Sequence, residues 1–340
     1  MVPQDLIIRL AEACATKKRA PVFVLGCVRS GTTLLYHMLL SAGGFAVYRT
    51  ESNAVNLLEP RFGDLSVRRN KEELMEAWLN SKLFRVSGLE AESIREKIIA
   101  ECKNGGDFLR IVMGEVARSQ NVTRWADCTP EHLLYLNRIK ETIPNALIVH
   151  IIRDGRDVAL STAKLGYVQR KWWDRTPSTM VSALYWDWMV RKGRADGTKL
   201  GDDYIEVRFE ELVTKPRITL AKLSSFIDHD LDYDRILKVG IGSLREPNTS
   251  FKGGPTNNFN PIGRWKKGYT AEDLAMLEAL VGDTLTELGY PLATTDRALL
   301  NRPHLKRMRA LYQLYFTSKL WLKAETPLGR LFVTRSLSWL

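Results

Sequence analysis

Two short segments of the chain combine cations, hydroxyls and glycines in a way that suits phosphate binding. The first, residues 26–33, has the sequence Gly-Cys-Val-Arg-Ser-Gly-Thr-Thr and lies between a compact apolar run and an apolar segment with helical spacing. Backbone N–H groups in such a turn, together with the first turn of the following helix, form a ready anion site. These residues therefore predict the phosphate-binding loop of a nucleotide enzyme.

The second segment follows the clearest buried-strand pattern in the chain, residues 146–152. That run ends at Arg153, and Ser161 lies eight residues later on a predicted helix. Open α/β sheets bind ligands at the carboxyl ends of their strands, and a guanidinium group pairs with two phosphate oxygens at once. Arg153 and Ser161 thus predict a second phosphate site, whereas Arg156 and Asp157 are expected to make surface ion pairs.

The phosphate loop departs from that of enzymes that use nucleoside triphosphates. Those enzymes have lysine directly after the second glycine, and the next Ser or Thr holds magnesium. Here Thr32 occupies the lysine position and the nearest cation is Arg29. A kinase must neutralise a highly charged polyphosphate, so a kinase that uses Mg-ATP is the weaker alternative. A phosphosulfate carries less charge and can be held by N–H groups, hydroxyls and one cation.

Both motifs resemble those of the PAPS-dependent sulfotransferase superfamily, where PAPS is 3′-phosphoadenosine 5′-phosphosulfate. Residues 21–33 are similar to its 5′-phosphosulfate loop and residues 147–161 to its 3′-phosphate motif. The resemblance covers about residues 21–290 and is closest to the glycan and protein-tyrosine branches. It implies direct in-line transfer of a sulfuryl group from PAPS to an acceptor hydroxyl, with 3′,5′-ADP as the product and no metal.

The resemblance also assigns the residues that hold the cofactor. Arg153 and Ser161 would bind the 3′-phosphate. The segment Gly-Arg-Trp-Lys at 263–266 is similar to the family's late loop, which closes over the cofactor, although a solvated basic turn is an equal alternative. The backbone and side chains of the phosphate loop would hold the phosphosulfate, through Arg29, Ser30, Gly31, Thr32 and Thr33. The late loop would add three further residues to the cofactor site: Arg264, Trp265 and Lys266.

Sulfuryl transfer needs a general base for the acceptor and a cation that stabilises the leaving phosphate. Glu51 follows the phosphate-loop helix by one short segment and is the predicted base, while Arg29 is the predicted catalytic cation. In the protein-tyrosine and glycan branches, a glutamate in a comparable position is the base. An exposed acid that caps the helix near Ser52 is the alternative interpretation of Glu51, and His132 is the competing base.

Two positions depart from the family pattern. Cys128 stands where the family often has lysine, and Phe209 stands where it often has tyrosine. Lys164 and Arg156 are the candidates to replace the missing lysine. These departures leave a third class open, a non-catalytic module that binds nucleotides or membranes on the same scaffold.

The elements that position these residues alternate between strands and helices. Strands are predicted at 21–25, 125–127, 146–152 and 204–209, and the intervening segments carry helical spacing. This alternation predicts a P-loop-type three-layer α/β fold, with a mainly parallel central sheet and helices on both faces. Residues 1–296 would form the sulfotransferase domain, with a helical cap at 55–120, and residues 297–340 a basic amphipathic appendage.

The composition favours anionic partners, because the net charge is +11 and the pI is about 9.5. No nucleic-acid-binding motif is present, so the acceptor is expected to be a small molecule, glycan, glycolipid or peptide tyrosine. The tail at 299–340 can contact an anionic membrane, pack on the domain or join two copies. Four scattered cysteines and the lack of a signal peptide or spanning segment favour a cytoplasmic protein.

Four aromatic residues are candidates for the acceptor pocket or for the core. Trp172 and Trp173 lie just before the helix predicted to begin at Thr176, and they are left as candidates that line a pocket. Tyr185 and Trp188 have helical spacing within that helix, which favours a place in the core.

Overall fold

The centre of the molecule is a sheet of four parallel strands. The computed structural model describes residues 17–168, 174–246, 260–294 and 303–332. The strands lie in the order β2-β1-β3-β4, and every pair is parallel. Continuous apolar runs are typical of parallel strands buried on both faces, and this pattern made the two central strands, β1 and β3, predictable. The bounds of the four strands are β1 Val22–Leu25, β2 Ala126–Asp127, β3 Leu147–Ile152 and β4 Tyr204–Arg208.

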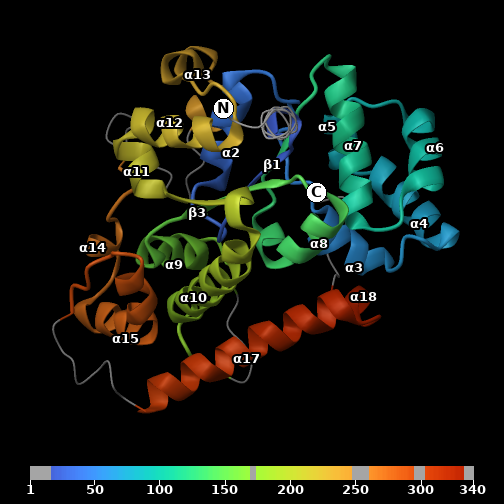
Figure 1. Cartoon of the computed structure of the whole chain (residues 1–340). Helices are drawn as coiled ribbons and strands as arrows, with labels where there is room; N and C mark the ends of the chain where they lie inside the picture. The colour runs from blue at the N-terminus through green and yellow to red at the C-terminus, as the bar shows by residue number, and fades with distance from the viewer. Residues whose placement is uncertain (1–16, 169–173, 247–259, 295–302, 333–340) are drawn as a thin grey trace, which may run out of the picture.

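Helices cover both faces of this sheet, as the sequence predicts (Figure 1). Alternate residues of β1 point to opposite sides: Phe23 and Leu25 belong to one apolar core, and Val22 and Val24 to another. The first core is covered by long helices that include α7 (Gly105–Ser119) and α10 (Ser178–Gly197), and the second by α2 (Thr32–Ala42), α12 (Pro216–Ile227) and α13 (Tyr233–Val239).

Between the phosphate-loop helix and β2, the regular elements from Ala54 to Ser119 are all helices. The helices predicted at 71–80, 90–103 and 107–118 are present, but the shorter α5 was not predicted because it has only six residues. Trp78 anchors this group by packing edge-on against Phe84 and Phe108, with ring centroids 5.1 and 5.3 Å apart. The elements are the π-helical turn η1 Ala54–Leu58, α3 Glu59–Phe62, α4 Arg68–Leu79, α5 Lys82–Ser87, α6 Ala91–Glu101 and α7.

The remaining elements connect the strands and follow the last one. The helix predicted from Thr129 to Thr142 begins as a 3-10 turn, and the helix predicted at 4–16 lies outside the described residues. These elements are η2 Pro130–Tyr135, α8 Leu136–Thr142, α9 Gly155–Lys164, η3 Thr198–Asp203, α11 Phe209–Thr214, η4 Gly242–Leu244, α14 Trp265–Gly268 and α15 Ala271–Glu287.

The basic tail forms a long helix, α17 (Pro303–Glu325), that lies across α10 (Figure 1). Its Phe316 is buried against Trp188, with ring centroids 5.4 Å apart, and its Arg309 donates to the buried carboxylate of Asp187 at 3.0 Å. Beyond it, α18 (Gly329–Phe332) carries Arg330, which donates to the carbonyl of Phe62 at 2.6 Å. The tail therefore packs on the domain along its described length. None of the described helices has the length and apolar character needed to cross a bilayer.

Candidate functional site

The backbone of the phosphate loop is tightly packed and has two residues with positive φ. Gly31 has φ +99°, and a Cβ atom there would lie 2.3 Å from the ring of Phe209. A Cβ on Gly26 would lie 2.4 Å from the carbonyl oxygen of Ile151 on the neighbouring strand. Arg29 is left-handed as well, with φ +71°, a conformation that is costly for a residue with a side chain. The loop is thus wedged between β3 and Phe209 in a strained form.

The hydroxyls of the loop cluster at its junction with α2. Thr32 and Thr33 are the first two residues of that helix, and Thr32 is buried. Ser30 is fully buried, and its hydroxyl has no hydrogen-bond partner in the described chain. Buried polar groups are normally paired, so this hydroxyl indicates a binding site for a polar ligand.

The two predicted phosphate motifs meet in the structure. The Nε atom of Arg29 donates to the hydroxyl of Ser161 at 3.1 Å, across 132 residues of sequence. Arg153 donates to the backbone carbonyl of Arg29 at 2.9 Å. Burial lowers the pKa of both arginines, and the nearby Arg29 and Arg264 lower that of Arg153 further. Three cations are therefore gathered where the sequence predicts two phosphate groups.

Arg153 is held in place from several sides. Its guanidinium lies over the ring of Phe209, 4.6 Å from the centroid, and also donates to the carbonyl of Pro261. Its Nε atom is buried without a partner among the described residues. Phe209, which stands where the family often has tyrosine, thus supports both Arg153 and Gly31 through its ring.

The surface ion pairs predicted for Arg156 and Asp157 are wrong, because both residues are buried. Arg156 pairs with Asp154 and with Glu278 of α15, each at 2.7 Å, and the Trp265 ring covers it at 3.8 Å. Glu278 and Trp265 lie more than 100 residues along the chain from Arg156, so no local pattern revealed these two contacts.

The start of the late loop is fastened to this buried group. Asp157 accepts from the backbone N–H groups of Gly263 and Trp265 at 2.8 and 2.9 Å. Arg264 is half-buried, donates to the carbonyl of Asn260 at 2.8 Å and lies close enough to Arg153 to affect its pKa. Lys266 is exposed, with its ammonium 5.7 Å from the centroid of the Trp265 ring. The structure therefore brings Arg264 toward the phosphate site and leaves Lys266 at its outer rim.

Glu51 lies in a partly buried, acidic environment. Burial, and then the charges of Asp127 and Glu131, raise its pKa from 4.5 to about 7. The next residue, Ser52, is buried, and its hydroxyl lies 3.2 Å from the hydroxyl of Thr129. This contact fixes the segment beside the end of β2. A carboxyl group with a pKa near neutrality is suited to accept a proton at physiological pH.

His132 is occupied by structural hydrogen bonds. Its Nε2 atom accepts from the backbone N–H of Val55 at 3.3 Å, so Nδ1 carries the proton and donates to Asp127 at 2.9 Å. The ring is fully buried. Both nitrogens therefore position the acidic segment around Glu51, and neither is directed to an acceptor.

The residues considered in place of the missing lysine lie apart from one another. Cys128 is buried, and its burial and the charges of Asp127 and Glu51 raise the pKa of its thiol. Lys164 is exposed in the last turn of α9, and Arg156 is engaged in its own ion pairs.

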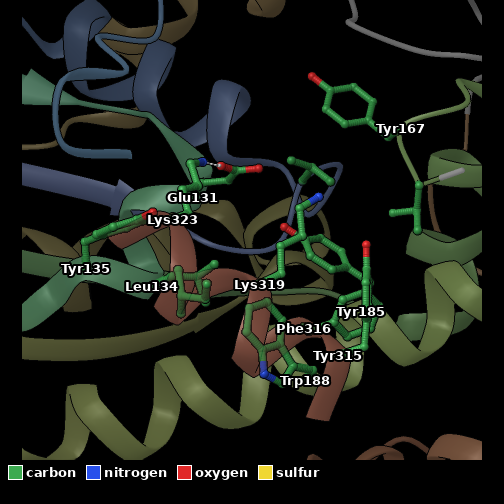
Figure 2. A pocket seen from close by; sticks show the side chains of 13 residues that line it. Glu131, Leu134, Tyr135, Tyr167, Tyr185, Trp188, Tyr315, Phe316, Lys319 and Lys323 are labelled. Carbon is green, nitrogen blue, oxygen red and sulfur yellow. Dashed lines mark hydrogen bonds and ion pairs between the residues drawn. The ribbon is translucent and has the colours of Figure 1, made fainter. Parts of the chain in front are cut away.

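A cavity of about 180 Å³ opens beside the phosphate loop and is walled by α10, η2 and α17 (Figure 2). Sequence reasoning assigned Tyr185 and Trp188 to the core; they pack in the core and also line this cavity. Trp172 and Trp173 lie outside the described residues. The lining residues that the sequence did not identify include one acid, two cations and several rings: Glu131, Lys319, Lys323, Tyr135, Tyr167, Tyr315 and Phe316.

The comparisons with known proteins agree with this site. The model of a family described as "Sulfotransferase family" matches residues 21–233, which include the phosphate loop, Arg153 and Ser161. No curated protein matches the chain in sequence.

Solved structures that resemble this chain include two sulfotransferase domains and a retinol dehydratase. The sulfotransferase domain of the curacin biosynthetic pathway has a TM-score of 0.53 at 15% identity, covering 80% of this chain and 98% of its own. The sulfotransferase domain of the Synechococcus PCC 7002 olefin synthase has a TM-score of 0.49 at 17% identity, and the match covers 78% of this chain and 94% of that domain. Retinol dehydratase, solved with androsterone and the inactive cofactor PAP, has a TM-score of 0.40 at 15% identity, and the match covers 79% of this chain and 81% of that chain.

Proposed function

Because the chain belongs to the sulfotransferase family, we propose that it transfers the sulfuryl group of PAPS to an acceptor hydroxyl. The observation that carries this proposal is the hydrogen bond between Arg29 and Ser161. It joins the phosphate loop to the second phosphate motif, and PAPS carries phosphate groups at both the 5′ and the 3′ position of one ribose. A cofactor with two separate anionic groups matches a site that is built from two motifs.

The residues present fit such a cofactor. The buried Ser30 hydroxyl and the Arg153 Nε atom have no partner among the described residues, and each can donate to a phosphate oxygen. The loop backbone, Ser30, Thr32 and Thr33 would hold the 5′-phosphosulfate, which supplies the sulfuryl group and a phosphate leaving group. Arg153, Ser161 and Arg264 would hold the 3′-phosphate. Trp265 would support that site through its contact with the buried Arg156.

Glu51 is the proposed general base. Its carboxylate takes the proton of the acceptor hydroxyl while the acceptor oxygen forms its bond to sulfur and the bond from sulfur to the leaving phosphate oxygen breaks. Arg29 offsets the negative charge that develops on that oxygen. Lys323 and a hydrogen bond from Asn56 hold the pKa of Glu131 below its usual value despite burial, whereas that of Glu51 is raised. Two neighbouring carboxyl groups with separated pKa values are characteristic of acid–base sites.

Calorimetric titration with 3′,5′-ADP in EDTA tests the cofactor assignment. We expect binding without metal, and weaker binding of 5′-AMP, which lacks the 3′-phosphate. A charge-assisted phosphate contact contributes about 1.5–3 kcal/mol, so Arg153→Ala should weaken 3′,5′-ADP roughly ten- to a hundredfold. Ser161→Ala, a smaller change, should weaken it less, and Lys222→Ala on the exposed face of α12 should have no effect.

Two other results would reject the proposal. Binding of Mg-ATP together with no binding of 3′,5′-ADP would identify a kinase. Binding of 3′,5′-ADP without transfer of labelled sulfate from PAPS to any acceptor or to water would identify a non-catalytic module.

A further inference from the structure

The cavity of Figure 2 adjoins the phosphate loop and the acidic segment around Glu51. Val28 of the phosphate loop forms part of its wall, and Glu131, another lining residue, is close enough to Glu51 to raise the pKa of that carboxyl. Tyr167 lies on a further wall and interacts electrostatically with Arg29. The cavity thus adjoins both the proposed base and the proposed catalytic cation.

One wall of this cavity is supplied by α17, which lies outside the segment that matches the family model. That segment ends at residue 233, whereas Tyr315, Phe316, Lys319 and Lys323 come from a helix that begins at Pro303. The family match therefore does not determine this wall, and its chemistry is a property of this chain.

The apolar part of the cavity is aromatic and small. Figure 2 shows Tyr185, Phe316 and Trp188 grouped on one side, and ring contacts between 5.4 and 5.8 Å hold these three side chains together. A volume of about 180 Å³ is slightly larger than a cavity of roughly 150 Å³ that accommodates benzene. The space therefore suits one aromatic ring with a short substituent.

The polar part of the cavity carries an excess positive charge. Lys323 pairs with Glu131 at 3.5 Å on the side opposite the aromatic group (Figure 2). Lys319 forms no ion pair or hydrogen bond with the described residues, but its charge helps to lower the pKa of Glu131. Two ammonium groups thus face one carboxylate, and one positive charge is left in excess beside the rings. The hydroxyl of Tyr135, another lining residue, is buried and also lacks a partner in the described chain. A ligand with one anionic group and further acceptor atoms would satisfy both.

We propose that the acceptor is a small phenol or aromatic alcohol that carries one acid group, and that Lys319 selects it by pairing with that group. The aromatic side of the cavity holds the ring, and the hydroxyl points toward Glu51 and the phosphate loop. This inference rests on the proposed sulfuryl transfer for its reaction, but not for its binding site.

Calorimetric titration of three matched ligands, with and without saturating 3′,5′-ADP, tests the inference. The ligands are 3-(4-hydroxyphenyl)propanoate, its neutral amide and the cationic 2-(4-hydroxyphenyl)ethylamine. Because Lys319 is exposed, we expect the acid to bind about two- to fivefold more tightly than the amide, and the amine to bind most weakly.

Variants at Lys319 show whether this residue sets the preference. Lys319→Met keeps the apolar stem and should make acid and amide bind equally, whereas Lys319→Arg should keep the preference for the acid. Lys306→Met, an exposed site on the same helix, is the control and should behave like the wild-type protein. Equal binding of acid and amide to the wild-type protein, a preference that survives Lys319→Met, or no binding of any of the three ligands would each overturn the inference.

The same titrations separate this inference from the proposed function. If 3′,5′-ADP binds but the acid is not preferred, the acceptor assignment fails and the sulfotransferase proposal stands. If the acid is preferred in a Lys319-dependent way but 3′,5′-ADP does not bind, the cavity is a ligand site and the proposed reaction is wrong.

Discussion

Replacing Glu51 by glutamine should change how the stability of the protein depends on pH. The pKa of Glu51 is raised from 4.5 to about 7 in the folded protein, chiefly by burial. A carboxyl group of this kind contributes stability that is fully present below about pH 4.5 and is lost as the pH rises through 7. The buried negative charge that makes Glu51 a suitable base is therefore a cost to the fold at neutral and alkaline pH.

The size of the effect follows from the shift. One pKa unit corresponds to about 1.4 kcal/mol, so a rise from 4.5 to about 7 removes about 2–3 kcal/mol of unfolding free energy between pH 5 and pH 8. The Glu51→Gln variant cannot ionise at this position and should lack that loss. Other titrating groups contribute equally to both proteins, so the difference between their pH dependences isolates Glu51.

Urea denaturation of both proteins at pH 5 and pH 8 measures this difference. The wild-type protein should lose about 2–3 kcal/mol more than the variant on going to pH 8. Glu96→Gln, on the exposed surface of α6, is the matched control and should show the wild-type pH dependence. If the two pH dependences coincide within about 0.5 kcal/mol, Glu51 is not a buried carboxyl with a raised pKa, and the argument for it as the base loses its physical support.

Three further predictions concern the same site. The rate of sulfuryl transfer should rise with pH through about 7 as Glu51 loses its proton, and Glu51→Gln should lower that rate about 10²–10⁴-fold without changing 3′,5′-ADP affinity; an unchanged rate would show that another group takes the proton. Gly31→Ala should abolish 3′,5′-ADP binding in calorimetry, because its Cβ atom would meet the Phe209 ring; retained affinity would contradict the fit of the loop. Arg156→Leu should destabilise the protein by about 3–5 kcal/mol in urea denaturation, because Asp154 and Glu278 would keep buried charges without a partner; a loss below 1 kcal/mol would show that these charges are solvated.

The sequence predicted the parts of the fold that depend on local patterns. The two central strands, β1 and β3, are compact and mostly apolar runs, and the phosphate loop is a continuous string, so each could be identified without knowing its neighbours. Arg153 and Ser161 were placed in one site for the same reason, since a strand end and the following helix are adjacent in sequence and in space.

The parts that were missed depend on contacts between distant segments. Asp157 is typical of an exposed helix start until residues 263–265 fold over it, and those residues lie more than 100 positions later. Glu131 and Lys319 become neighbours only when α17 lies across α10, which no spacing within either segment indicates. The raised pKa of Glu51 has the same origin, because it arises from burial and from acids on another strand and turn.

Because α17 comes late in the chain, the proposed cofactor site and the cavity wall beside it are synthesised at different times. Chains are synthesised from the N-terminal end, and every described residue of the proposed cofactor site precedes Pro303. The cavity wall that α17 supplies can form only after this helix is synthesised, and the contact of Arg330 with Phe62 closes a loop of 268 residues. Under the proposed function, mutations in this one helix would alter the acceptor cavity and leave the residues proposed to bind the donor unchanged, so acceptor specificity could change without loss of the reaction.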